Sequence, residues 1–241
     1  MTTTDLASEP LPTDTVGLLE GLTTTRSIRR YRDEPVPEDA LRAMLFAATR
    51  APSGSNRQPF RFIVLTDGDG AREAKRIIGD AARRAWGHKR ATDGYDEGSG
   101  ARDNSPKARM ARTMQAYVDD FERAPVLVLP CLERYRAPWY GEGASVYPAC
   151  QNLLLAARAL GYGGVLSMWH ELVDRDLHEL LRIPDEVVVA ATITIGRPAG
   201  HHGMVRRRPL SELVWGERWG DAPEWAVDPP GTRHTAAGPP R

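Results

Sequence analysis

Three arginines and a hydroxyl group lie within five residues near the start of the chain, at Arg26, Ser27, Arg29 and Arg30. Guanidinium groups form bidentate, charge-assisted hydrogen bonds to phosphate oxygens, so residues of these types at this spacing can hold a phosphate. In an extended backbone, Ser27 and Arg29 point to one side while Arg26 and Arg30 point to the other. One pair would then face a ligand and the other would form structural contacts. A solvated basic stretch is the alternative interpretation.

A second group of small polar residues occupies positions 51–60, which read A-P-S-G-S-N-R-Q-P-F. Serine hydroxyls, a glycine and an amide offer many hydrogen-bonding groups with little bulk. Such a loop can follow a polar chain or the edge of a heterocycle closely. A Ser- and Gly-rich turn between a helix and a strand is the alternative interpretation.

Alternating helices and strands are expected to position these two groups. The periodicity of apolar residues and the turn signals predict helices that begin near Asp14 and cover 37–49, 71–85, a stretch ending at 121, 145–160 and 174–181. They predict strands or extended segments at 60–66, 124–130, 163–167 and 186–195. Residues 87–106 show no apolar period, and an irregular stretch of this length in a compact domain is typical of a lid.

Composition excludes several classes of partner. The 241 residues are 41% hydrophobic and 27% charged, with 32 basic and 32 acidic side chains, so there is no basic excess for nucleic acid or an anionic membrane. Cys131 and Cys150 lack the spacing of a zinc site or disulfide scaffold, and no His/Cys/acid pattern predicts a metal. No apolar run is long enough to span a bilayer, and the N-terminus does not read as a signal peptide. We therefore expect a cytoplasmic protein.

Four motifs in order give the sequence a family resemblance. R-S-I-R-R-Y (26–31) and A-P-S-G-S-N-R-Q-P-F (51–60) are followed by A-C-Q-N-L-L-L-A-A with A-L-G (149–161), and then by I-G-R-P (195–198) with R-R-R-P-L (206–210). Together they resemble the FMN-dependent nitroreductase family from about Leu22 to Val214. One departure is Thr25, which stands where many members carry a further arginine.

The resemblance implies an α+β fold in which a central mixed sheet is flanked by helices, and an intertwined homodimer with FMN at the subunit interface. The expected domain would cover 14–214, with a lid insertion at 86–108 and a flexible arm at 1–13. Residues 215–241 would form an extension. Its tryptophans, Trp215, Trp219 and Trp225, predict that part of it packs on the partner subunit, with a disordered end.

The resemblance also implies which residues hold the cofactor. Arg26 and Ser27 would contact the FMN phosphate, and Arg207 would close on it from the C-terminal side. Arg29 would approach N1 and O2 of the flavin, where positive charge tunes the cofactor. The remaining expected contacts line the ring and ribityl chain, the first four from the other chain, and Ser167 near flavin N5: Pro52, Ser53, Gly54, Asn56, Leu166, Ser167 and Met168.

The activity implied is a ping-pong, two-electron transfer from NAD(P)H to a nitroaromatic or quinone-like small molecule. Flavin N5 would carry the chemistry, so no catalytic side chain is predicted. Trp86, Trp139 and Tyr140 would shape the acceptor pocket, although ordinary packing explains them equally well. Reductive dehalogenation, enone reduction, flavin cleavage, use of a deazaflavin and a non-catalytic flavin-sequestering role remain open.

Overall fold

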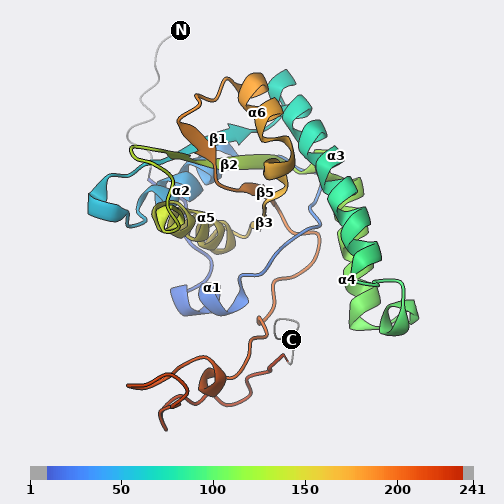
Figure 1. The fold of residues 1–241 in the computed structure, drawn as a ribbon, viewed down its shortest axis with the longest axis vertical. Coiled ribbons are helices and arrows are strands. Elements are labelled where there is room, and N and C mark those ends of the chain that lie inside the picture. The colour runs from blue at the N-terminus through green and yellow to red at the C-terminus, as the bar shows by residue number, and fades with distance from the viewer. Residues whose placement is uncertain (1–9, 236–241) are drawn as a thin grey trace. The chain divides into compact units, whose positions relative to one another are not determined.

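A computed structural model of the chain describes residues 10–235 and divides into two compact units, Met1–His202 and Gly203–Arg241. The first unit holds a five-stranded sheet: β1 (Phe60–Leu65), β2 (Val126–Glu133), β3 (Gly163–Ser167), β4 (Val187–Val189) and β5 (Thr192–Gly196) (Figure 1). The strand order is β1-β2-β5-β3, and β4 pairs with β2. This arrangement confirms the predicted α+β class.

The predicted mixed sheet is wrong for the described residues, because all four strand pairings between them are antiparallel. Two connections explain the difference. A pair of helices joins β1 to β2. The chain runs along one face of the sheet in each direction through these helices, so β2 enters the sheet antiparallel to β1. A single helix joins β2 to β3, which gives them the same direction, but β5 inserts between them and pairs with both in the opposite direction.

Helices cover both faces of this sheet. On one face lie α2 (Glu38–Thr49) and α5 (Tyr147–Ala159), and on the other lie α3 (Asp69–Thr92), α4 (Pro106–Asp119) and α6 (Asp174–Leu181). The side chains of strand β2 explain why both faces are covered, because they pack alternately into two cores. One core receives Val126, Val128 and Leu132, and the other receives Leu127, Leu129 and Cys131. A strand that is buried on both faces reads as a continuous apolar run.

The first helix begins later than the sequence predicts. α1 spans Leu18–Thr24 rather than beginning near Asp14. The reason is Thr15, whose backbone N–H and hydroxyl both donate to the Ala159 carbonyl at 2.7 Å and hold this stretch against the end of α5. The predicted strand at 186–195 is also divided at 190–191. There β2 presents Pro130, which has no N–H to complete the ladder.

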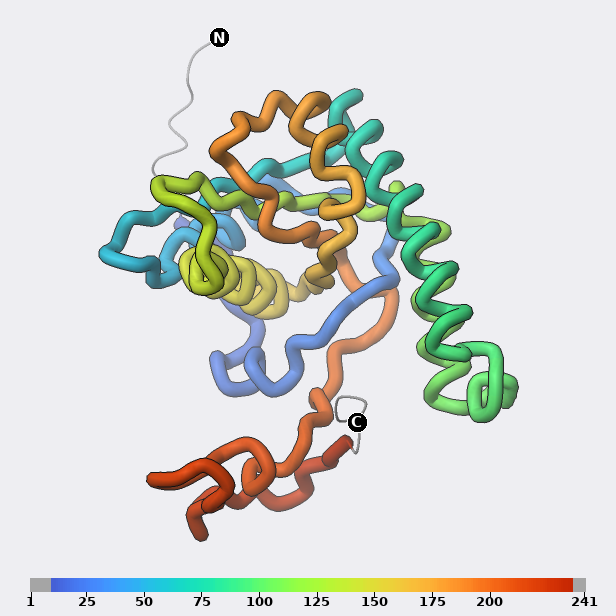
Figure 2. Tube along the Cα trace, in the orientation of Figure 1, coloured from blue at the N-terminus to red at the C-terminus, as the bar shows by residue number. Residues whose placement is uncertain are grey.

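The irregular stretch between α3 and α4 is shorter than expected. α3 continues to Thr92 and α4 begins at Pro106, which leaves residues 93–105 as the connection. Figure 2 traces the two helices side by side. The buried stripe of α3 extends to Trp86, and the turn beyond it is stabilised by an ion pair between Lys89 and Asp93 at 2.6 Å. Beyond Trp86 the helix continues through G-H-K-R-A-T, where Ala91 is the one apolar side chain, so the sequence shows no periodic signal there.

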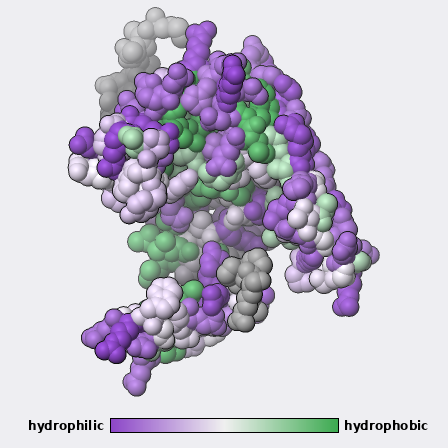
Figure 3. All heavy atoms as spheres, in the orientation of Figure 1, coloured by the Kyte–Doolittle hydropathy of each residue, from purple (hydrophilic) through white to green (hydrophobic). Residues whose placement is uncertain are grey.

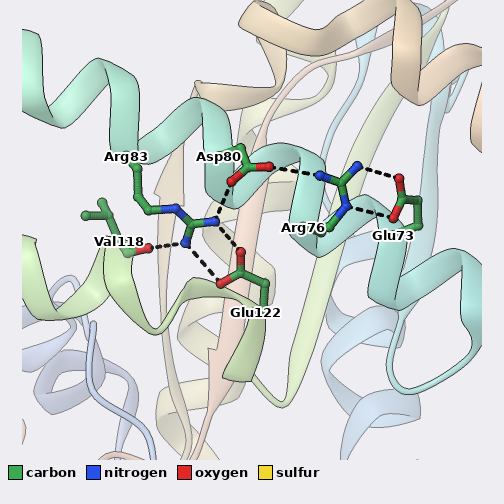
Figure 4. A network of polar contacts seen from close by, with 6 residues as sticks. All are labelled: Glu73, Arg76, Asp80, Arg83, Val118 and Glu122. Atoms are coloured by element: carbon green, nitrogen blue, oxygen red, sulfur yellow. Dashed lines mark hydrogen bonds and ion pairs between the residues drawn. The ribbon is translucent and has the colours of Figure 1, made fainter.

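A network of charged residues fastens α3 to the end of α4 (Figure 4). The Arg83 guanidinium donates to Glu122 at 2.5 Å, to Asp80 at 2.8 Å and to the Val118 carbonyl at 2.9 Å. Gly79 leaves the space for this contact, because a Cβ there would lie 2.5 Å from Glu122 Oε1. Charge-assisted bonds to several acceptors are stronger than a single surface ion pair.

We therefore expect Arg83→Met to lower the free energy of unfolding by about 1–2 kcal/mol, since three acceptors lose a donor. Urea unfolding followed by circular dichroism would measure it. Arg84→Met is the matched control, because Arg84 is the exposed neighbour on the same helix. Equal effects of the two substitutions would contradict a specific role for the network.

The second unit is described from residue 203 to residue 235 and has little regular structure. It holds one short 3₁₀ turn, Leu210–Glu212, and a bridge between Arg207 and His234. Trp215 and Trp219 meet edge to face, with ring centroids 5.7 Å apart. Trp219 and Trp225 are nevertheless 90% and 73% exposed, which leaves the predicted packing on a partner subunit as a prediction. Residues 1–9 of the predicted arm at 1–13 and the end of the extension at 236–241 lie outside the described residues.

Candidate functional site

The arginine-rich segment is extended and lies beside β3. The backbone N–H of Ile28 donates to the Gly164 carbonyl at 3.0 Å, and the Ile28 side chain is buried. A Cβ at Gly163 would lie 2.6 Å from that side chain, so glycine is needed for the close approach. Arg26 and Ser27 on this segment are exposed. The segment therefore presents both residues to solvent from a fixed backbone.

Buried hydroxyl groups in the protein interior hold the arginine-rich segment in place. The Tyr31 hydroxyl donates to the Ile28 carbonyl at 2.7 Å and lies 2.8 Å from Thr194 Oγ1. Tyr117 of α4 reaches the same Thr194 oxygen at 2.7 Å. Burial raises the pKa of both tyrosines, so they stay neutral. One threonine of β5 thus ties the arginine-rich segment to α4.

Arg29 is the half-buried cation of this segment. Its Nε is buried and has no hydrogen-bond partner among the described residues. Burial lowers the pKa of Arg29, while Tyr117 and Tyr31 oppose that shift, and the group remains cationic at neutral pH. Unsatisfied buried donors are costly, so this nitrogen makes Arg29 a candidate for contact with a ligand.

Leu166, Ser167 and Met168 lie at the end of β3, as the resemblance implies for a segment that flanks a ring. The Ser167 hydroxyl is a second buried polar group without a partner among the described residues. Arg29 and Trp169, the residue after Met168, line one cavity of about 300 Å³. Of this part of the chain only Trp169 reaches the cavity that Arg29 lines, and residues 166–168 stop short of its lining.

The same cavity contains Trp86, but not as part of an open lid. Trp86 is only 4% exposed, its indole N–H donates to Gln115 at 3.0 Å, and its ring packs against Tyr95. The remaining apolar side chains of the cavity are those of Ala85, Met110, Met114 and Trp169. Trp86 thus belongs to a packed α3–α4 wall, and its proposed contact with an acceptor stays a prediction.

The loop 52–58 has an unusual backbone. Ser55, Asn56 and Gln58 all have positive φ, between 50° and 52°, a region that non-glycine residues avoid. The Gln58 N–H donates to Ser53 Oγ at 2.9 Å and helps to hold the turn. Strained backbone of this kind is found at ligand clamps and active sites.

The loop 52–58 contacts the region that carries the other two predicted pocket residues. Ser145 Oγ accepts from the Gly54 N–H at 3.3 Å, and the Arg57 guanidinium lies 4.5 Å from the ring centroid of Tyr135. In the same region Trp139 is 42% exposed, with Arg136 stacked 4.2 Å from its centroid, and Tyr140 is fully exposed. Exposed aromatic side chains beside a polar loop are available to a ligand or a partner.

The predicted site residues thus form two groups in the first unit. One group comprises Arg26, Ser27, Arg29, Trp86 and 166–168, and the other comprises Pro52, Ser53, Gly54, Asn56, Trp139 and Tyr140. Neither of the two cavities lined by Arg29 includes a residue of the second group. In Figure 1 the loop that follows α2 lies at the left edge, while the segment that follows α1 runs toward α3 and α4. Arg207 lies in the second unit, where its Nη1 donates to the Arg206 carbonyl at 2.9 Å.

His170 follows the 166–168 segment and is buried. Its Nδ1 lies 3.2 Å from Thr192 Oγ1, and Thr192 pairs with Ser167 across the sheet. Burial lowers the pKa of His170, while the carboxylates of Glu171 and Asp174 oppose the shift. The unfolded state therefore binds the proton more readily, so His170 costs stability as the pH falls below about 6.5.

We expect His170→Gln to reduce the loss of unfolding free energy between about pH 7.5 and pH 5.5, because glutamine cannot take up the proton. Urea unfolding at both pH values would measure it. His202, whose pKa burial also lowers, keeps part of the dependence in the variant. His88→Gln, at an exposed position of α3, is the control. An unchanged pH dependence in His170→Gln would contradict the assignment.

The two cysteines are buried and free. Burial raises the pKa of the Cys150 thiol to about 12 and that of Cys131 to about 11, so both are protonated at neutral pH. Within residues 10–235, no group of three or more His, Cys, Asp or Glu side chains is arranged to hold a metal ion. No described helix is both long and apolar enough to cross a membrane.

Sequence reasoning missed the residues that support the site. Thr194 is the clearest case, and its signal is a hydroxyl residue in the otherwise apolar buried strand T-I-T-I-G. Ser145 holds the 52–58 loop from 91 positions away, and Tyr117 comes from a helix that the sequence placed only by its end. Their roles depend on tertiary contacts that spacing along the chain does not reveal.

Comparison with known proteins agrees with the motifs. The model of the "Nitroreductase family" matches residues 22–197. A protein of Methanothermobacter thermautotrophicus named "Putative NADH dehydrogenase/NAD(P)H nitroreductase" is 30% identical over 192 residues, which cover 77% of this chain and 80% of that protein. Human iodotyrosine deiodinase 1 is 25% identical over 209 residues, covering 81% of this chain and 66% of that protein.

A solved structure shares the fold. It is the crystal structure of "a putative nitroreductase in complex with fmn" from Desulfovibrio desulfuricans, and it is 29% identical to this chain. The TM-score is 0.62, and the match covers 84% of this chain and 97% of that chain.

Proposed function

The chain belongs to the nitroreductase family, and we propose that it is an FMN-dependent NAD(P)H oxidoreductase that reduces a nitroaromatic or quinone-like small molecule. The observation that carries this proposal is that Arg29 Nε and Ser167 Oγ are two of the four buried side-chain polar atoms without a hydrogen-bond partner among the described residues. Arg29 lines the cavity of about 300 Å³, and Ser167 lies two residues before Trp169, which also lines it. The segments that carry Arg29 and Ser167 resemble those that contact FMN in the family.

The residues present fit FMN. Arg26 and Ser27 are exposed on a fixed extended backbone, where they would hold the phosphate. Arg29 offers Nε and a positive charge to the pyrimidine edge, and Ser167 offers a hydroxyl at the end of β3. When bound, FMN supplies two-electron chemistry between a nicotinamide and an acceptor.

The remaining chemistry falls to the protein. The positive charge of Arg29 favours the electron-rich form of the cofactor. Because Arg29 is partly buried, water screens this electrostatic interaction less. The packed wall of Trp86, Met114 and Trp169 keeps water away from the cavity. No side chain is required to act as an acid or base toward the acceptor.

We further propose that each FMN site is composed of two chains. The strained 52–58 loop and Arg29 are separate within one chain, so a second copy would bring its loop to the first copy's Arg29. A groove of about 490 Å³ between α1, α2 and α5 supports this proposal, with Leu18 and Phe46 exposed at its edge. Figure 3 shows hydrophobic surface over α1.

An anaerobic absorbance titration tests the activity. The purified protein would be titrated with NADH or NADPH, and then with nitrobenzoate or a quinone. A flavin spectrum that bleaches with the donor and returns with the acceptor is expected. A protein that shows no flavin absorbance and takes up no added FMN would overturn the proposal, while bound FMN that neither donor bleaches would favour sequestration.

Reductive dehalogenation is the second candidate, because one relative is named iodotyrosine deiodinase. Adding a halogenated phenol as acceptor to the same titration separates the two activities. Halide release together with return of the flavin spectrum would favour the second candidate.

A further inference from the structure

A second cavity also borders the arginine-rich segment, and four arginines line it. It has a volume of about 290 Å³ and lies between residues 29–33 and the C-terminal end of α4. Its charged lining consists of Arg29, Arg30, Arg32, Arg123, Asp33 and Asp120. Four cations face two carboxylates, a local excess of two positive charges in a chain whose formal net charge is zero.

The backbone that carries Arg30 and Arg32 is fixed. The Arg32 N–H donates to the Arg197 carbonyl at 2.8 Å, and the Ala199 N–H donates to the Arg30 carbonyl at 3.0 Å. Between them, Tyr31 points its hydroxyl inward to Thr194. Side chains alternate along an extended backbone, so Arg30 and Arg32 share the outward side. The guanidinium groups of Arg30 and Arg32 are therefore presented on the same side. Because their backbone is already fixed, binding a ligand costs little further conformational entropy in the backbone.

The cations of this cavity are available to a ligand. Within residues 10–235, Arg30 and Arg32 form no ion pair, and Arg123 has only long ones, at 3.6 Å to Asp33 and 3.9 Å to Asp120. Small side chains leave the space open, namely those of Ala116, Ala124 and Ala199. A planar guanidinium matches the oxygens of a phosphate bidentately, and Arg30 and Arg32 together would balance the two charges of a dianion, leaving Arg29 to the flavin.

We propose that this cavity is a second anion site, separate from the FMN phosphate position at Arg26 and Ser27, and that it binds a phosphate monoester dianion. Two sources have this chemistry: the 2′-phosphate of NADPH and a free phosphorylated small molecule. Only the NADPH source rests on the proposed function. If NADPH is the source, the cavity would give the enzyme its choice between the two nicotinamide donors.

The test uses the full chain saturated with FMN, titrated with inorganic phosphate in a calorimeter. Arg30→Gln/Arg32→Gln should weaken phosphate binding at least about tenfold, because two bidentate donors are lost. Arg84→Gln/Arg112→Gln is the control, since it removes the same charge from exposed positions of α3 and α4. Flavin content should stay unchanged in both double variants. Absence of phosphate binding in the wild-type protein, or its equal loss in both double variants, would overturn the site.

Steady-state kinetics of the same proteins identify the source. A KM for NADPH that rises about tenfold, with the KM for NADH unchanged, would assign the site to the donor's 2′-phosphate. Unchanged values for both donors, together with lost phosphate binding, would assign it to a separate phosphorylated ligand. Failure of the proposed function has a different signature, since neither nicotinamide would then bleach the flavin while calorimetry still reports phosphate binding.

Discussion

Arg29→Gln is expected to lower kcat/KM by about a hundredfold or more, the usual cost of removing one preorganised group that stabilises developing charge. Arg29 is a half-buried cation with an unpartnered Nε beside the cavity, so its field is weakly screened by water. Losing it should also make the bound flavin harder to reduce. A loss of 1.4 kcal/mol corresponds to about 30 mV for a two-electron couple, and we expect a shift at least that large to lower potential.

A potentiometric titration of the variant separates this electrostatic role from a structural one. Arg29→Lys keeps the charge but loses the planar fork, so it should restore most of the potential and less of the FMN affinity. Arg84→Gln removes an exposed arginine of α3 and should leave potential and kcat/KM unchanged. An unaltered flavin potential in Arg29→Gln would contradict the placement of Arg29 at the pyrimidine edge.

Mixing two inactive variants should restore about a quarter of the sites, if each site takes one half from each chain. One variant, Arg26→Ala/Arg29→Ala, damages the arginine-rich segment, and the other, Ser53→Ala/Asn56→Ala, damages the strained loop. Each homodimer has only damaged sites. In the mixed dimer one site combines both damaged halves, and the other combines both intact halves.

The measurement is flavin content and turnover after the two proteins are unfolded and refolded together. The control mixes Arg26→Ala with Arg29→Ala chains, in which every composite site keeps one damaged segment and nothing is restored. Activity of the first mixture no greater than the average of its two parents would contradict a site shared between chains. It would leave the FMN assignment of Arg29 in place, because that rests on separate measurements.

Much of the fold could be predicted from local pattern. The i, i+3, i+4 spacing of α2 and the apolar runs of β1 and β2 are strong signals, and α6 was expected at its observed bounds, Asp174–Leu181. Strand direction could not be predicted, because it depends on where β5 inserts. The end of α3 beyond residue 85 was missed because, after Trp86, its residues show no apolar period.

The candidate site also has a part that could be predicted from the sequence and a part that could not. The family resemblance was enough to single out Arg29 and Ser167, which the structure leaves with unpartnered buried atoms among the described residues. It was not enough to find Thr194 or Ser145, whose partners lie far away along the chain. Nor does one sequence show that Arg30 and Arg32 border a cavity, since that requires the end of α4 to pack opposite them.

The three left-handed residues of the 52–58 loop have a consequence for efforts to make this protein more heat-resistant. Glycine tolerates positive φ at no steric cost, so glycine at Ser55 or Gln58 would relieve about 1 kcal/mol of backbone strain at each position. It would also let the loop sample many shapes. Laboratory evolution that selects only for thermal stability is therefore expected to accumulate such glycine substitutions. The resulting protein would be more stable but would bind its cofactor with lower affinity. A screen that scores flavin retention alongside heat resistance would keep the native residues.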